Sequence, residues 1–225
     1  MKNEAGIILD FLADVRANNN REWFAANRAR YDEARTLFRA VAEDMIARIG
    51  AFDASVAGMP VEQTLYRFYR DTRFSADKSP YKRHMGTFIN ARGKKSQHGG
   101  YYLHLEPGAC LIAVGTYWHE SRVVRAIREE IALRTDEFAA IVDEAAFRRA
   151  YTSLSIESLK TMPKGFPKDF PRPELLRMKD FCASRPLPDS FFAAPDWPER
   201  AARLFRTGKP YMDFINEVVD DYIDE

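Results

Sequence analysis

The first 50 residues alternate between apolar and polar positions with the period of a helix. A short amphipathic helix is predicted over 4–17, with an apolar stripe made by Ile7, Ile8, Phe11, Leu12 and Val15. Three asparagines at 18–20 interrupt the stripe, and Asn19 or Asn20 is suited to cap the next helix. That long helix is predicted over 21–49, because apolar residues recur seven positions apart at Phe24, Tyr31, Phe38 and Met45.

The period changes between residues 63 and 118. Four short segments are rich in aromatic or β-branched residues and are bounded by glycine, proline and charged turns: 63–70, 84–91, 100–107 and 110–118. Their connections have about a dozen residues or fewer and no helical pattern, which favours antiparallel pairing. Strand alternation places Tyr102, His104 and Glu106 on one face of the predicted sheet, and Leu103 and Leu105 on the other.

Helical spacing returns after the strands. It begins near Ser121, and a last helix carries an apolar stripe from Tyr211 to Tyr222. The intervening segment 163–198 holds eight of the twelve prolines, and its apolar residues predict a stiffened segment wrapped over the core. Helices, strands and helices again indicate an α+β fold. We predict one domain over 1–225, with a four-stranded or slightly larger antiparallel sheet and helices mainly on one face.

The composition of the chain argues against some classes of protein but does not indicate an activity. No apolar run approaches the roughly 20 residues of a membrane span, and the N-terminus lacks the pattern of a signal peptide. Cys110 and Cys182 are the only cysteines, so we expect reduced thiols and a cytoplasmic location. The net charge of +1 gives no general indication of nucleic-acid binding. We expect no membrane partner, and the sequence leaves the oligomeric state open.

Positive charge is concentrated in the segment RDTRFSADKSPYKRH, residues 70–84. Guanidinium groups, a positioned lysine and turn N–H groups are suited to a phosphate or carboxylate. The candidate ligand-binding residues here are Arg70, Asp71, Arg73, Asp77, Lys78, Ser79, Tyr81 and Lys82. The alternative is an ordinary salt-bridged turn, in which Asp71 and Asp77 neutralise the arginines. Against that, surface ion pairs stabilise a fold by only ~0–1 kcal/mol each.

Two other groups can contribute to a site. His104 and Glu106 are weak candidates for acid–base catalysis, and Tyr102 and Trp118 are expected near them as ligand-binding residues. The competing interpretation is a structural histidine held by Glu106 on a solvated face. No HExxH motif or close histidine pair occurs, so we expect no metal, and nothing indicates a cofactor. Lys164, in MPKGFPKD, is a further candidate for contacting an anion.

Several motifs carry a resemblance to a known family. In order along the chain they are NNNREWFAANRARY (18–31), RFYRDTRFSADKSPYKRHMGTFI (67–89), GYYLHLEPG (100–108) and LKTMPKGFPKDFP (159–171). They resemble the DUF2461 family over most of the chain. The resemblance implies a domain of unknown function and supplies no reaction. Phe170 stands where this family commonly has a histidine, so no catalytic base is expected at that position.

Three functions therefore remain open at the level of sequence. The leading one is binding of a small anionic or phosphate-bearing ligand at 70–82, with or without a reaction on it. The second is nucleic-acid binding by the basic segment 67–95, with Tyr66, Phe68 and Phe88 available for stacking. The third is a structural or adaptor protein. Whether the chain is an enzyme is left open.

Overall fold

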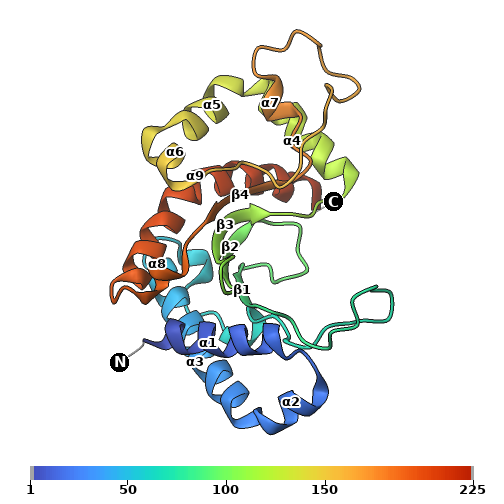
Figure 1. The fold of residues 1–225 in the computed structure, drawn as a ribbon. Helices are drawn as coiled ribbons and strands as arrows, with labels where there is room; N and C mark the ends of the chain where they lie inside the picture. Colours follow the sequence, from blue (N-terminus) through green and yellow to red (C-terminus); the bar gives the residue numbers. More distant parts are fainter. Residues whose placement is uncertain (1–2, 224–225) are drawn as a thin grey trace. The chain divides into compact units, whose positions relative to one another are not determined.

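A computed structural model describes residues 3–223 of the chain (Figure 1). The chain forms two compact units, each assembled from separate segments. The first unit runs up to Ala91 and adds Tyr102–Ile112 and Pro186–Ala202. The second unit comprises Arg92–Tyr101, Ala113–Arg185 and the chain from Arg203 onward. The single domain over 1–225 that the sequence suggests stays a prediction.

The first unit begins with three helices. They are α1 (Glu4–Ala17), α2 (Arg21–Ala26) and α3 (Arg28–Gly50), and the 3₁₀ turns η1 (Ala54–Val56) and η2 (Val61–Gln63) follow. The Asn20 side chain accepts a hydrogen bond from the Trp23 N–H, which confirms one of the two predicted caps. The long helix predicted over 21–49 is two helices, because Asn27 leaves helical geometry and its amide donates to the Trp23 carbonyl.

The core of the first unit is largely aromatic. α1 packs against α3 and against α8 (Asp189–Ala193), and the apolar stripe of α3 is buried as predicted. Phe24, Tyr31 and Phe68 lie within ring-contact distance of one another. Tyr81 stacks on Phe24 with ring centroids 3.9 Å apart, so the chain beyond the basic segment is anchored in this core.

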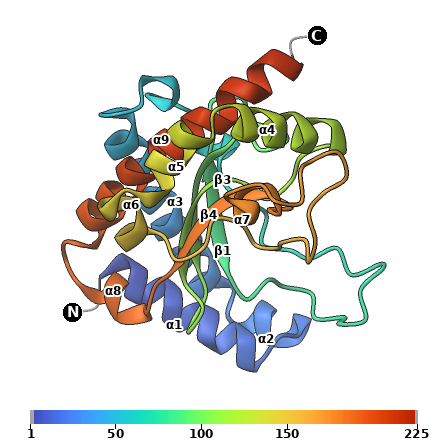
Figure 2. The ribbon, with the colours of Figure 1, turned by 90° about the horizontal axis from the view of Figure 1, so that it is seen from above.

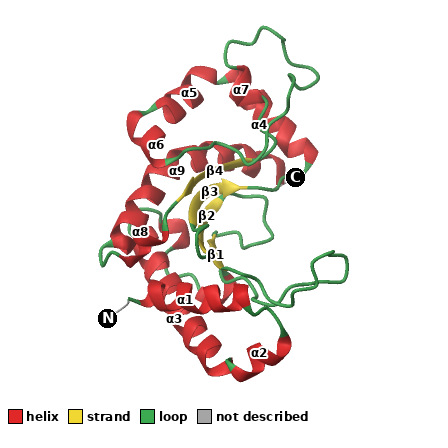
Figure 3. Ribbon diagram, in the orientation of Figure 1, coloured by secondary structure: helices red, strands yellow, loops and turns green. Residues whose placement is uncertain are grey.

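Four antiparallel strands form one sheet in the order β1-β2-β3-β4, as Figure 3 shows in yellow. They are β1 (Met85–Ile89), β2 (Gly100–Leu105), β3 (Leu111–Thr116) and β4 (Phe181–Pro186). The α+β fold class is therefore confirmed. Both alternating sets of side chains in β1 are buried, so the sheet has no fully solvated face at that strand.

One strand assigned from the sequence was wrong, and one strand was missed. Residues 63–70 form no strand and make only isolated bridges, at Leu65 with Thr87 and at Tyr69 with Tyr81. The fourth strand is instead β4, which lies in the proline-rich segment that was expected to wrap over the core. Prolines cluster outside its hydrogen-bonded stretch, with Pro186 at its end, so the segment 181–185 keeps its backbone donors.

The second unit contains the remaining helices: α4 (Ser121–Leu133), α5 (Thr135–Asp143), α6 (Ala145–Ala150), α7 (Pro173–Leu176) and most of α9 (Trp197–Ile223). α5 and α6 lie beside α9 (Figure 2), with Phe138 against Phe214 and Phe147 against Tyr211. The predicted apolar stripe of the last helix is buried from Tyr211 to Val219. Within residues 3–223, no helix combines the length and the apolar character of a membrane span.

β3 and β4 approach each other unusually closely at Gly115. This residue has φ +100°, and a Cβ placed on it would lie 2.0 Å from the Phe181 carbonyl oxygen. The neighbouring atom is backbone and cannot swing away, so glycine is required here for two independent reasons.

We predict that Gly115→Ala lowers the free energy of unfolding by about 3 kcal/mol or more, since overpacking adds to left-handed strain. Gly165→Ala is the matched control, because Gly165 has φ +96° but open space around its Cβ position. Its expected cost is about 1–2 kcal/mol. Urea denaturation of both variants measures the difference, and equal losses would contradict a steric role for Gly115.

Candidate functional site

Six polar or aromatic side chains of the first unit gather around the pairing of β1 and β2. We call them the sheet-face cluster: Tyr66, Lys82, His84, Tyr102, His104 and Glu106. His84 directly precedes β1, and Glu106 directly follows β2. Because side chains alternate along a strand, Tyr102, His104 and Glu106 point to the same side, as the sequence predicted.

Hydrogen bonds connect three members of the cluster in a row. Tyr102 Oη lies 2.8 Å from His104 Nδ1, and His104 Nε2 lies 3.0 Å from Glu106 Oε2. An ionised Glu106 accepts from Nε2–H, so Nδ1 is then the acceptor for the tyrosine hydroxyl. This Tyr–His–Glu chain can hold or transfer a proton, which is the chemistry expected of His104 and Glu106.

The imidazole ring of His84 lies beside this hydrogen-bonded chain. The His84 and His104 ring centroids are 4.3 Å apart, and His84 Nδ1 lies 3.9 Å from Glu106 Oε2. Burial lowers the pKa of His84 to about 4, with smaller contributions from His104 and Lys82. Burial also lowers the pKa of His104, against the opposing effect of Glu106. Both imidazoles are therefore neutral at pH 7.

Gly86 leaves the space that the tyrosine of the cluster occupies. A Cβ on Gly86 would lie 2.8 Å from the Tyr102 hydroxyl oxygen. The absence of a side chain in the middle of β1 thus lets Tyr102 reach across the neighbouring strand. The Tyr66 ring meets Tyr102 edge-on, with centroids 6.2 Å apart, and completes that side of the cluster.

Lys82 is the cation of the sheet-face cluster. Its side chain is half-buried, and its Nζ lies 5.3 Å from the centroid of the Tyr66 ring. Burial lowers the pKa of Lys82, and the charge of Arg67 lowers it further. Among the residues that the structure describes, no carboxylate forms an ion pair with this ammonium.

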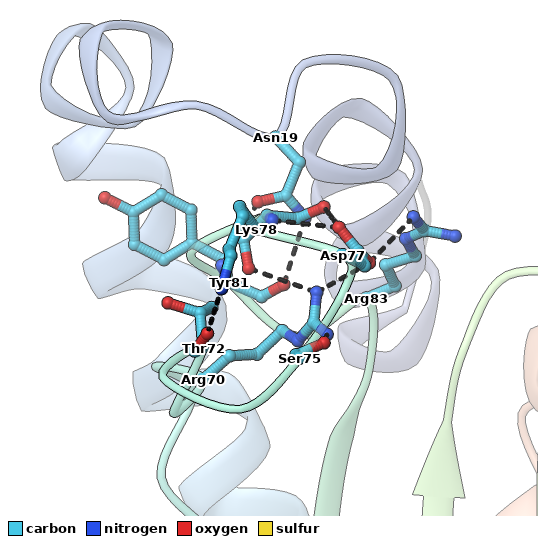
Figure 4. Close-up of polar contacts among 9 residues, drawn as sticks. Asn19, Arg70, Thr72, Ser75, Asp77, Lys78, Tyr81 and Arg83 are labelled. Atoms are coloured by element: carbon cyan, nitrogen blue, oxygen red, sulfur yellow. Dashed lines mark hydrogen bonds and ion pairs between the residues drawn. The ribbon is translucent and has the colours of Figure 1, made fainter.

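Three of the other cations of the basic turn, residues 70–83, form ion pairs within it, and the fourth, Lys78, donates to a backbone carbonyl. Arg70 donates to Asp77 at 2.7 Å and to the Ser79 carbonyl at 3.1 Å (Figure 4). Arg73 pairs with Asp71 at 2.7 Å, and Arg83 lies 3.6 Å from Asp77. Lys78 donates to the Thr72 carbonyl at 3.0 Å. Three guanidinium groups thus share two carboxylates, as the salt-bridged alternative required.

Local hydrogen bonds also shape this turn. Asp77 accepts from both the Ser79 hydroxyl and the Ser79 N–H, and these bonds and Arg70 hold the pKa of Asp77 well below its usual range. Hydrogen bonds from Arg73 lower the pKa of Asp71. Ser79 therefore serves the turn itself. At its base, the Asn19 side chain donates to the Tyr81 carbonyl and accepts from the Tyr81 N–H, at 3.0 and 3.1 Å (Figure 4).

The remaining predicted residues are distributed between the two units. Tyr81 lies in the core of the first unit, 5% exposed, and presents its backbone rather than its ring to the turn. Trp118 and Lys164 belong to the second unit, where both side chains are exposed. The first unit thus brings together Lys82, Tyr102, His104 and Glu106 from the predicted set. A ligand role for the others stays a prediction.

Sequence reasoning missed His84 as a member of this group. It lies 20 positions before His104, so no short motif joins the two histidines. The available signal was its position at the start of a predicted strand that neighbours 100–107. Only the register of β1 against β2 converts that position into a ring contact with His104.

A second row of hydrogen bonds lies in the second unit. Ser96 Oγ is 2.7 Å from His98 Nδ1, and His98 Nε2 is 2.8 Å from Asp220. Ser96 Oγ also accepts from the His98 backbone N–H, which closes a local turn. Asp220 pairs in addition with Arg92 at 3.2 Å. This row joins the loop before β2 to the end of α9, and we assign it a structural role.

His119 is a buried histidine in the second unit, next to the predicted Trp118. Neither of its ring nitrogens has a hydrogen-bond partner in the part of the chain that the structure describes. The ring meets Phe181 edge-on at 5.7 Å. Burial lowers the pKa of His119 to about 4, and His98 lowers it slightly further. The folded protein therefore holds this imidazole neutral.

This predicts a pH-dependent loss of stability. An unfolded histidine titrates near 6.5, so between pH 6.5 and 4 the unfolded state binds a proton that folded His119 does not. The resulting stabilisation is fully present above pH 6.5 and is lost as the pH falls towards 4, by up to about 1.4 kcal/mol per pH unit. His119→Phe should show a shallower fall in urea-unfolding free energy than the parent. Parallel pH profiles would contradict this assignment.

Comparison with known proteins supports the resemblance seen in the motifs. A family model described as "Conserved hypothetical protein (DUF2461)" matches residues 7–214. The match includes β1 to β4 and every member of the sheet-face cluster. No curated protein sequence and no solved structure matches the chain. The chain therefore belongs to the DUF2461 family of conserved hypothetical proteins.

Proposed function

We propose that this protein binds a small anionic or phosphate-bearing ligand at the sheet-face cluster, with Lys82 as the cation. The observation that carries the proposal is the half-buried ammonium of Lys82, which forms no ion pair with a carboxylate among residues 3–223. Withdrawing a charge from water without a counter-charge is unfavourable, and a bound anion removes that cost. Lys82 was one of the residues predicted from the sequence to bind an anion.

The surroundings of Lys82 suit an anion better than the tip of the basic turn does. The guanidinium groups of Arg70 and Arg73 already bind Asp77 and Asp71, so a ligand would have to displace a carboxylate. The sheet-face cluster instead offers a tyrosine hydroxyl and the imidazole of His84 near the free charge. The proposed site therefore moves from the middle of the segment 70–82 to its end.

Acid–base chemistry on the bound ligand is a natural extension of this function. The Tyr102–His104–Glu106 chain places a proton donor or acceptor in the same cluster, with both links at hydrogen-bond distance. A cytoplasmic location accords with the two free, buried thiols, Cys110 and Cys182.

The nucleic-acid alternative receives less support from the side chains. Phe68 and Phe88, two of the three aromatic residues expected to stack on bases, are 5% and 8% exposed. Stacking needs an accessible ring face, so neither residue is available in this conformation. Phe74, at the tip of the basic turn, is 97% exposed, and Arg73 lies over its ring. It is the residue to replace when testing for nucleic-acid binding.

We predict that millimolar phosphate, sulfate or a phosphorylated metabolite raises the melting temperature of the parent protein. At ten times the dissociation constant, linkage gives about 1.4 kcal/mol, or roughly 3–5 °C for a chain of this size. Lys82→Gln should abolish the rise, because it removes the cation and keeps a polar, unbranched side chain only one atom shorter. Differential scanning fluorimetry across a panel of anions at fixed ionic strength measures the effect.

Arg73→Gln is the matched control in the same turn. It removes an equal charge from an exposed residue that is already paired with Asp71, so it should respond to anions as the parent does. Loss of the response in Arg73→Gln but not in Lys82→Gln would return the site to the tip of the turn. A flat response of the parent to every anion would end the proposal.

A further inference from the structure

The sheet-face cluster also contains a set of metal-binding side chains that the sequence alone did not suggest. Among residues 3–223, His84, His104 and Glu106 can each direct one ligand atom to a common point, with the three atoms within 4.8 Å of one another. Two imidazole nitrogens and one carboxylate oxygen are the donor set of many zinc and non-haem iron sites. We propose that these three residues bind a divalent transition-metal ion, with Zn²⁺ the ion they fit best.

The distances between the donor atoms suit such an ion. A tetrahedral Zn²⁺ with bonds of about 2.0–2.1 Å separates its ligand atoms by roughly 3.4 Å. In the structure, Glu106 Oε2 lies 3.0 Å from His104 Nε2 and 3.9 Å from His84 Nδ1. Both separations are within about half an ångström of the required value, and the third, between the two imidazole nitrogens, is within 4.8 Å. Small side-chain rotations would bring the three atoms onto one ion.

The supporting residues suit the same role. When a metal occupies Nε2 of His104, the ring proton resides on Nδ1 and must be accepted by a neighbour. Tyr102 Oη lies 2.8 Å from Nδ1, and a hydroxyl can accept this hydrogen bond as readily as it donates one. Tyr102 is therefore a positioning residue, which orients His104 whether or not the metal is bound.

His84 has a donor available for the ion. No hydrogen bond of its ring nitrogens is found among the described residues, and His84 Nδ1 lies 3.9 Å from Glu106 Oε2. The side chains of His84 and Glu106 are 28% and 26% exposed, which leaves a route for an ion from solvent. Ligands at the ends of two paired strands are also held by the rigid part of the fold.

Nearby Cys110 does not belong to the ligand set. Its thiol is directed at the Glu106 backbone carbonyl, 3.2 Å away, and lies 3.6 Å from Asp189 Oδ1. The protein would thus supply three ligands and leave at least one coordination position open, the arrangement of catalytic rather than structural zinc sites. An open position beside Lys82 would suit the anion proposed above, although the metal site does not depend on that ligand.

The test is a calorimetric titration of the metal-free full chain with Zn²⁺ alone in phosphate-free buffer. Co²⁺ serves as a second probe, because tetrahedral coordination produces visible absorption bands. We expect one ion per chain. His84→Asn and Glu106→Gln should each weaken binding at least tenfold, and Tyr102→Phe by about tenfold with both histidines intact. Glu129→Gln, an exposed carboxylate on α4, is the control and should bind as the parent does.

Two outcomes would overturn the metal site. One is the absence of saturable uptake by the parent, and the other is uptake that His84→Asn and Glu106→Gln leave unchanged. Circular dichroism checks that the variants fold. His84→Asn decides alone if Glu106→Gln does not fold, because the His84 side chain makes no hydrogen bond within residues 3–223. Lys82→Gln separates the two proposals. It should remove the response to anions and keep or strengthen the binding of the bare cation, since a repelling ammonium is gone.

Discussion

The pairing of β1 with β2 is the constraint on which the candidate site depends. Alternation along β2 sends Tyr102 and His104 to one side, while its leucines are buried on the other. The register with β1 then places Gly86 under the Tyr102 hydroxyl and His84 beside His104. A slip of β1 by one residue would turn His84 to the opposite face, away from His104.

The charges near this pairing fall into two groups with different consequences. Asp71 and Asp77 pair with the three arginines of the basic turn, Ser79 donates to Asp77, and the Thr72 carbonyl accepts from Lys78. Such exposed pairs contribute little each, but together they give the turn a defined shape. Lys82 lies near the end of the turn, next to Tyr81 where the chain enters the core, and the ion pairs of Asp71 and Asp77 are made by arginines instead. The same chain segment therefore presents a hydrogen-bonded network at its tip and, at its base, a lysine that forms no ion pair with a carboxylate of residues 3–223.

The sheet-face cluster combines the ammonium of Lys82 with three side chains that could bind a divalent cation, and electrostatics explains how the two can coexist. Like charges repel, so a metal ion and Lys82 are compatible when an anion lies between them. Many sites for phosphate-bearing ligands combine a cationic side chain with a metal for this reason. The Tyr102–His104 hydrogen bond can form with or without a bound metal ion, because the tyrosine hydroxyl can act as donor or as acceptor.

Local pattern was enough to predict a large part of this protein. The helical stripes, the Asn20 cap, the antiparallel α+β class and the shared face of Tyr102, His104 and Glu106 all follow from side-chain periodicity, which needs no knowledge of distant residues. β4 and the one-residue interruption at Asn27 did not follow, since strand pairing and a side chain competing for a backbone carbonyl can each override a local pattern. The tertiary structure alone decided which cations find acids and that His84 meets His104. The ion pairs and the histidine contact depend on strand register and burial. Neither can be inferred from the local sequence around residues that lie 20 positions apart.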